Sequence, residues 1–203
     1  LKPGRVINGT ANFFKHWIGP TTGAISKKLK KKWRFGQANK TRLIYGAGLS
    51  REDAGIQFAQ IMKYMDQSNV TPNFMEIDLS TFDGTQSKET MELLAIIYDG
   101  ITEGEVSQKM EEYMKLIGGK KSMKYRHPIG NSKWRKKVTV KGSVEATRFS
   151  GSMDTSLGNT LLQGFVVWML TKDIEHCWSF VHGDDVFIIS GEKLQQTAVK
   201  NMY

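Results

Sequence analysis

The chain has 203 residues, of which 39% are hydrophobic, so it can build one sizeable domain or two small ones and is not a disordered sequence. Its formal net charge of +9 favours a polyanionic partner, either nucleic acid or an anionic membrane surface, although a basic protein can also lack such a partner. The single cysteine, Cys177, excludes an internal disulfide and a thiolate zinc cluster and fits a reducing compartment. No apolar run approaches membrane-spanning length. Because the chain starts at Leu1 and stops at Tyr203 within an expected helix, we expect it to be part of a longer protein.

The first third of the chain gives few structural signals. Residues 1–23 are rich in Gly, Asn and Thr and show no clear period, so they predict no element. A lysine cluster follows at residues 27–34, and such a run is usually a solvated face. Residues 40–45 alternate polar with apolar side chains, which predicts a short strand with cations on one face that could line a channel for phosphates.

A helix and a strand with a terminal acid come next. Ser50 to Asp53 has the pattern of a capping box and predicts the start of a helix. Phe74 to Leu79 predicts a strand that places Asp78 near its end, with Asp83 five residues further on. An acid on a largely buried strand is costly unless it is paired or bound to metal. Asp78 is therefore either satisfied by local backbone donors or a metal ligand.

The middle of the chain predicts two helices followed by a basic segment. One helix should start near Ser87, and a second capping box at residues 102–105 should start the other, which ends at Gly118-Gly119. Residues 120–137 are basic with interleaved aromatic residues, and they suit either a nucleic-acid surface or a solvated loop. Residues 138–144 predict a strand and a turn.

The last third contains a polar loop, a helix and a hairpin. Residues 148–160 are small, polar and punctuated by glycine, and the helix that follows should turn one apolar stripe inward. The expected inward residues are Leu161, Phe165, Trp168 and Met169. Residues 180–189 run apolar up to Gly183-Asp184-Asp185 and away from it again, the pattern of two strands joined by a tight turn. Residues 192–203 predict the start of a further helix.

Two adjacent carboxylates at a hairpin tip repel each other, and a bound divalent cation would remove this repulsion. This stretch is equally compatible with an ordinary hairpin tip that carries two solvated acids. If the strand ending at Asp78 pairs beside the hairpin, Asp78 and Asp184 converge. Two carboxylates from different strands can hold two divalent ions about 4 Å apart and so support phosphoryl transfer. Together with the basic balance, this arrangement indicates nucleotide polymerisation.

These stretches resemble, in order, three motifs of the palm of viral RNA-dependent RNA polymerases. Residues 78–83 are similar to motif A, residues 150–160 to motif B, and Gly183-Asp184-Asp185 to motif C, while residues 40–44 resemble the basic motif F of the fingers more weakly. The second motif looks most like that of positive-strand RNA viruses of the tombusvirus, nodavirus and flavivirus-related groups. One departure is Asp154, which stands where close relatives often carry Asn or Thr.

The resemblance implies template-directed attack of an RNA 3′-hydroxyl on the α-phosphate of an NTP. Asp78 and Asp184 would be the main ligands of two Mg²⁺ ions, with Asp185 in support and Mn²⁺ able to substitute. The residues implied to bind the nucleotide and read its ribose are Asp83, Ser150, Gly151, Thr155 and Asn159, and those implied to neutralise the triphosphate are Lys40 and Arg42. The general-acid lysine of the family cannot be assigned between Lys193 and Lys200.

The implied fold is α+β, a polymerase palm with a small antiparallel sheet backed by helices in an RRM-like core, with partial fingers and no thumb. The expected division is partial fingers with the basic strand (1–73), palm with the motif A strand and helix (74–100), a fingers-type insertion (101–147), and palm with motifs B, C and the start of the motif D helix (148–203).

The implied partners are template and product RNA, NTPs and the remaining fingers and thumb segments of the parent chain, in a membrane-associated viral replication complex in the host cytoplasm. We expect these 203 residues alone to polymerise weakly or not at all. Three other functions stay open: a reverse-transcriptase-like palm, a non-catalytic RNA-binding module, and a nuclease that uses the same metals.

Overall fold

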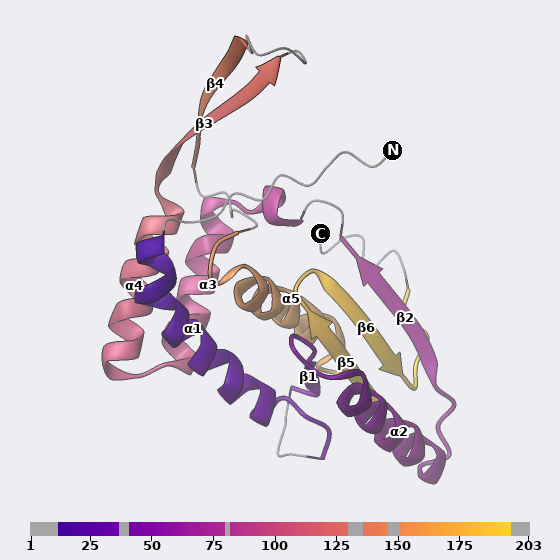
Figure 1. The fold of residues 1–203 in the computed structure, drawn as a ribbon. Coiled ribbons are helices and arrows are strands. Elements are labelled where there is room, and N and C mark those ends of the chain that lie inside the picture. Colours follow the sequence, from indigo (N-terminus) through magenta and orange to yellow (C-terminus); the bar gives the residue numbers. More distant parts are fainter. Residues whose placement is uncertain (1–11, 37–40, 80–81, 130–135, 146–150, 196–203) are drawn as a thin grey trace. The chain divides into compact units, whose positions relative to one another are not determined.

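A computed structural model describes residues 12–36, 41–79, 82–129, 136–145 and 151–195 of the chain (Figure 1). The chain divides into two compact units. The first consists of residues 1–82 and 149–203, and the second of residues 83–148. Each unit is described on its own below. The described elements make the protein α+β, as the sequence predicted.

The first unit is built on a mixed sheet with the strand order β1-β5-β6-β2. Its strands are β1 (Leu43–Tyr45), β2 (Asn73–Asp78), β5 (Cys177–His182) and β6 (Asp185–Ser190). Strand β6 pairs antiparallel with both β2 and β5, which gives the expected antiparallel core. Strand β1 pairs parallel with β5, so the sheet as a whole is mixed rather than antiparallel.

Helices cover both faces of this sheet. Helix α5 (Thr155–Thr171) contributes Val167 to a core cluster with residues such as Val181 and Ile188, while helix α2 (Arg51–Gln67) packs Ile61 and Met65 against the other face, where Ile189 lies. Consecutive strand residues therefore enter opposite cores, because side chains alternate between the faces of a strand. This two-sided burial explains why the sequence of β6 is an almost continuous apolar run.

Helix α1 (Asn12–Lys32) occupies the region for which the sequence predicted no element. It includes Pro20, and its last turn carries Lys30 to Lys32, so the lysine cluster is the end of a helix. The expected start of α2 is confirmed, since the Ser50 side chain accepts a hydrogen bond from the Asp53 backbone N–H.

The second unit contains α3 (Lys88–Ile101), α4 (Gly104–Gly118) and an antiparallel pair of strands, β3 (Lys120–Ile129) and β4 (Lys136–Glu145). A short 3-10 helix, Phe82–Thr85, precedes α3. Ser87 and Thr90 form a reciprocal capping box at the start of α3. The second predicted capping box is wrong: Thr102 instead donates to the backbone carbonyl of Tyr98 at the end of α3, and α4 starts without a side-chain cap.

Three further expectations need correction. The loop alternative for the basic segment is wrong, because its described residues form β3 and the start of β4; the nucleic-acid surface stays a prediction. On α5, Leu161 is buried as expected, but Phe165 and Met169 are 36% and 39% exposed. Residues 192–195 are irregular rather than helical, and the rest of the predicted terminal helix lies outside the described residues. Among the helices that the structure describes, none is long and apolar enough to span a membrane.

Candidate active site

The hairpin that joins β5 to β6 has a two-residue turn. His182 and Asp185 are the last paired residues, so Gly183 and Asp184 form the turn itself. Gly183 has φ +64°, whereas Asp184 does not have a positive φ. This combination fits a type II′ turn, which places glycine at the first central position and matches the twist of the strands. The glycine is thus what holds Asp184 at the tip.

Two acids and a histidine meet at this end of the sheet. Asp185 of the central strand is the Cα partner of Asp78 on β2 and of His182 on β5. Directly paired residues share one face and have Cβ atoms about 4.5–5.5 Å apart. All three residues are exposed and Asp184 beside them is half-buried. The strand pairing that the sequence argument required is present, but it sets Asp78 opposite Asp185 rather than Asp184.

The exposure of Asp78 corrects one step of the sequence argument. Asp78 was treated as an acid on a largely buried strand, yet β2 is an edge strand on which only Ile77 is buried. Burial therefore does not require a partner for the Asp78 carboxylate. The case for a site rests instead on the number of acids that share this end of the sheet.

Helix α5 lies against the turn. The Thr160 hydroxyl accepts a hydrogen bond from the Gly183 backbone N–H at 2.8 Å, and the Gln163 side-chain amide donates to the Asp184 backbone carbonyl at 3.1 Å. Both side chains are fully buried. Sequence analysis did not find Thr160, Gln163 or His182 as site residues, because their significance depends on tertiary contacts and strand register.

The loop before α5 carries several of the residues expected to read the ribose. Thr155 is the first residue of α5 and its hydroxyl donates to the Ser152 carbonyl at 2.9 Å, while Asn159 is buried. Gly151 is half-buried, and Ser150 lies outside the described residues. Asp83 belongs to the second unit, so the structure does not relate it to Asn159.

Asp154, the residue that departs from the family pattern, is fully buried at the N-terminus of α5. Its backbone carbonyl accepts from the Gly158 N–H at 2.6 Å. A carboxylate near a helix N-terminus is favoured by the helix dipole. Asp154 is therefore buried at this helix end and does not add an exposed charge.

Arg42, one of the two cations expected at the triphosphate, is not brought to the acids. Arg42 has a positive φ, and its guanidinium donates to the backbone carbonyl of Ile174, just before β5 begins. The parallel pairing of β1 with β5 places Arg42 at the end of the sheet opposite to Asp185. Lys40 lies outside the described residues.

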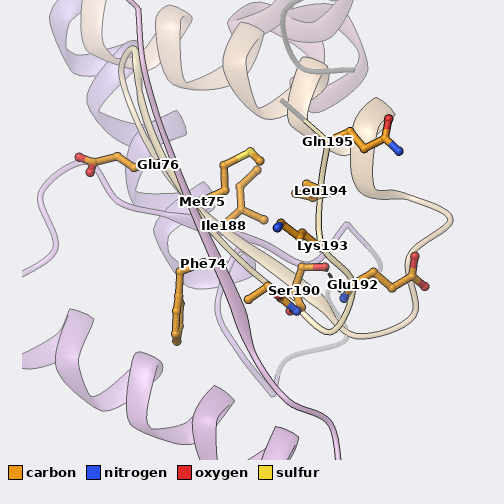
Figure 2. Close-up of a pocket in the computed structure, with 10 residues that line it drawn as sticks. Phe74, Met75, Glu76, Ile188, Ser190, Glu192, Lys193, Leu194 and Gln195 are labelled. Atoms are coloured by element: carbon orange, nitrogen blue, oxygen red, sulfur yellow. Dashed lines mark hydrogen bonds between the residues drawn. The ribbon is translucent and has the colours of Figure 1, made fainter. Parts of the chain in front are cut away.

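The candidate general acid Lys193 comes three residues after Ser190, the last residue of β6. It lines a groove of about 850 Å³ with Met75, Ile188 and Leu194 (Figure 2). Ser190, at the end of β6, pairs with Asn73, five residues along the strand from the Asp185–Asp78 pair. At about 3.4 Å per residue this separation is about 17 Å.

The donor set at the acidic end fits a hard divalent cation. Asp78, Asp184 and Asp185 offer carboxylate oxygens, and Mg²⁺ is usually held by one or two carboxylates together with water and phosphate oxygens. Among the residues that the structure describes, no cluster of three or more His, Cys, Asp or Glu side chains is arranged to enclose a metal ion. An open site, completed by a substrate phosphate, is the arrangement that these residues can form.

A family model described as viral RNA-dependent RNA polymerase matches residues 45–203. The chain belongs to this polymerase family. The match includes β2, α5 and the β5–β6 hairpin, and it excludes Lys40 and Arg42. Membership confirms the resemblance that the three motifs indicated.

The other comparisons add little. No curated protein sequence matches the chain significantly. Solved structures that match include a telomerase from Candida albicans in complex with a TWJ fragment of telomeric RNA, at 11% identity and a TM-score of 0.49. That match covers 94% of this chain but only 32% of the telomerase chain, and a likeness this weak supports no conclusion about activity.

Proposed function

We propose that the chain is the catalytic region of a viral RNA-dependent RNA polymerase, which transfers a nucleotide from an NTP to an RNA 3′-hydroxyl under the direction of a template. The observation that carries the proposal is the strand register, which sets Asp78 opposite Asp185 with Asp184 on the adjoining turn. Acids from two neighbouring strands at one exposed sheet end are what two-metal phosphoryl transfer requires. Membership of the polymerase family supports the same reaction.

Asp78 and Asp184 would hold two Mg²⁺ ions, with Asp185 in support, and Mn²⁺ could replace them. When bound, these ions would lower the pKa of the attacking hydroxyl and neutralise charge on the phosphates. The protein contributes position, because the acids lie on paired strands that cannot shift independently. Holding the reacting groups in place removes much of the entropic barrier to the reaction.

We propose that Asp83, Ser150 and Asn159 read the ribose 2′-hydroxyl, supported by Thr155 and Gly151. A carboxylate, a hydroxyl and an amide supply complementary donors and acceptors for that group. Lys40 stays a candidate for neutralising the triphosphate. Arg42 is left out of this role, because its guanidinium is engaged by the Ile174 carbonyl at the opposite end of the sheet.

The charge distribution supports RNA as the macromolecular partner. Residues 120–145 contain nine of the 29 Lys and Arg residues and one of the 20 Asp and Glu residues, so nine minus one gives this segment +8 of the net +9. The segment comprises β3, β4 and their connection. A concentrated cationic segment is the electrostatic signature of a phosphate-binding surface. We further propose that the parent protein acts in the host cytoplasm, in a membrane-associated replication complex.

The decisive test is primer extension on an RNA template by the full-length parent protein with Mg²⁺, comparing Asp184→Asn with Asp173→Asn. Asp173 is an exposed acid just after α5, beyond the opposite end of the sheet. We expect Asp184→Asn to lower kcat by about 100-fold or more, because charge stabilisation worth several kcal/mol is lost. Asp173→Asn should leave kcat unchanged. Equal activity of the two variants would reject the proposal.

Sugar selectivity separates this function from a reverse-transcriptase-like palm. The parent protein should use rNTPs in strong preference to dNTPs, and Asn159→Ala should narrow that preference. Competition between labelled ATP and dATP on one template measures the ratio. Equal use of both substrates by the unmodified protein would favour the reverse-transcriptase alternative.

A further inference from the structure

Thr160 and Gln163 occupy an unusual position for buried polar residues of a core helix. Each sends its side chain out of α5 to a backbone group of the turn, and the two bonded groups, the Gly183 N–H and the Asp184 carbonyl, bracket that turn. The Thr160 hydroxyl also donates to the Ser156 carbonyl at 2.7 Å. Its single proton is therefore committed within the helix, and its lone pair is left to accept from Gly183.

The turn needs such partners. In a two-residue hairpin the flanking pair, here His182 and Asp185, exchanges the last ladder hydrogen bonds, so the polar groups of the turn have no partner in the sheet. Gly183 is buried, which prevents water from replacing a lost partner freely. A buried N–H without an acceptor is costly, so a turn deprived of Thr160 would have to move to regain one.

We propose that Thr160 and Gln163 are positioning residues that hold the turn in the one arrangement in which Asp184 can bind a divalent cation. The inference rests on the proposed polymerase function and deepens it. The latch formed by these two residues touches neither cation nor substrate. It acts by raising the fraction of molecules in which Asp184 is in place, and apparent affinity scales with that fraction.

Thr160→Val is the informative variant, since it keeps the shape of the side chain and removes the hydroxyl. In the full-length parent protein, the Mg²⁺ concentration for half-maximal extension should rise about 10-fold, as expected when a buried donor loses its acceptor. At saturating Mg²⁺, the kcat of Thr160→Val should be within about 2-fold of that of the unmodified protein, because the cation favours the turn conformation that binds it. The KM for RNA should not change. Thr160→Ser retains the hydroxyl and should behave like the unmodified protein.

Thr171→Val is the matched control on the same helix. Thr171 is also buried and its hydroxyl makes the same kind of bond, to the Val167 carbonyl at 2.8 Å, but it lies three turns from Thr160. Both variants lose one intrahelical hydroxyl bond, so both should lower the Tm by similar amounts. Only Thr160→Val should change the Mg²⁺ requirement.

Two measurements without RNA or NTP complete the test. Hydrogen–deuterium exchange of the peptide covering residues 180–187 should be faster in Thr160→Val than in Thr171→Val, because the Gly183 amide loses its acceptor. Binding of Mn²⁺ to the protein alone, followed by electron paramagnetic resonance, should weaken about 10-fold in Thr160→Val only. Gln163→Met should also weaken Mn²⁺ binding, and it serves as the second variant if Thr160→Val does not fold.

The outcomes separate the latch from the polymerase function. If Thr160→Val and Gln163→Met keep the exchange rate, Mn²⁺ affinity and Mg²⁺ requirement of Thr171→Val while Asp184→Asn is inactive, the latch is rejected and the polymerase function stands. If Asp184→Asn is fully active, the polymerase function is rejected. In that case faster exchange of residues 180–187 in Thr160→Val would still show that Thr160 holds the turn.

Discussion

Neutralising two lysines on the β3–β4 pair should weaken RNA binding in a way that depends strongly on salt. Lys124 and Lys141 are direct Cα partners, and like charges at opposed positions destabilise an antiparallel pair. The register places them on one face of the pair with further cations, here called the cationic face. Its members are Lys124, Arg126, Lys137 and Lys141, whereas Lys120 on the same face is the Cα partner of the acid Glu145. A phosphate chain along this face would relieve the repulsion.

The magnitude follows from the number of cations. Each phosphate contact to a single strand contributes about −0.7 to the slope of log K against log salt, so the four cations of the cationic face predict about −2.8. Replacing Lys124 and Lys141 by Gln should reduce this slope by about 1.4, to about −1.4. Between 50 and 200 mM salt, affinity should then fall about 7-fold in the variant, against about 50-fold before the change.

The assay is a fluorescence-anisotropy titration of a labelled single-stranded RNA at several salt concentrations, with the full-length parent protein. The matched control is Lys88→Gln with Lys115→Gln, which removes the same charge from the same unit at exposed lysines that already have acidic partners, Glu92 and Glu111. The control should leave the slope unchanged. The Tm of Lys124→Gln with Lys141→Gln should not fall, because a like-charge pair is removed. Identical slopes for the two double variants would refute the reasoning.

Three further predictions concern the hairpin and the core beneath it. Gly183→Ala has open space around the added methyl group, so its cost should come only from the φ of +64° and amount to about 1–3 kcal/mol in urea unfolding, with a loss of extension activity; an unchanged midpoint would contradict this. Ile188→Ala, at a fully buried position of β6, should lower stability by about 2–5 kcal/mol, and a loss below 1 kcal/mol would show that the core collapses around the cavity. Burial raises the pKa of the Cys177 thiol above its ordinary value of 9.0, so the unfolded chain releases this proton first and stability should fall as the pH rises past about 9. Iodoacetamide at pH 8 should accordingly label Cys177 slowly in the native protein and rapidly in urea, and equal rates would contradict its burial.

Local sequence signals were sufficient for the elements that carry the acids. The strand ending at Asp78 and the hairpin around Gly183 each combine an apolar run with a turn signal, and these signals do not depend on distant residues. The pairing of these two segments could be inferred only from the chemistry that it would permit. The register, which sets Asp78 opposite Asp185, is fixed by tertiary packing of both sheet faces and was not available from local pattern.

Helix α1 shows why a real helix can leave no readable period. Its buried stripe runs through Ile18, Thr21, Thr22, Ile25 and Leu29, which has helical spacing. Two of these positions are threonine, so the apolar repeat appears interrupted. Pro20 and two glycines obscure it further.

Helix α5 presents the opposite difficulty, because it is apolar on most sides and several sets of residues satisfy a helical period. The set that was chosen included Phe165 and Met169, which are exposed, whereas Val167 is buried. Thr160 was overlooked for a related reason: a threonine that bonds back within its helix looks like many buried threonines. Only the fold shows that the same hydroxyl also reaches Gly183.

The two-residue turn also limits how this protein can vary in length. Side chains alternate along a strand with a period of two. A single residue inserted between His182 and Asp185 would therefore disturb the pairing of β5 with β6. It would either form a bulge or slide β5 by one position, which would exchange buried Val181 with exposed His182. The distance between the acids thus changes in discrete steps rather than gradually. We therefore expect this turn to tolerate no insertion, because any added residue would change which side chains lie beside the acids.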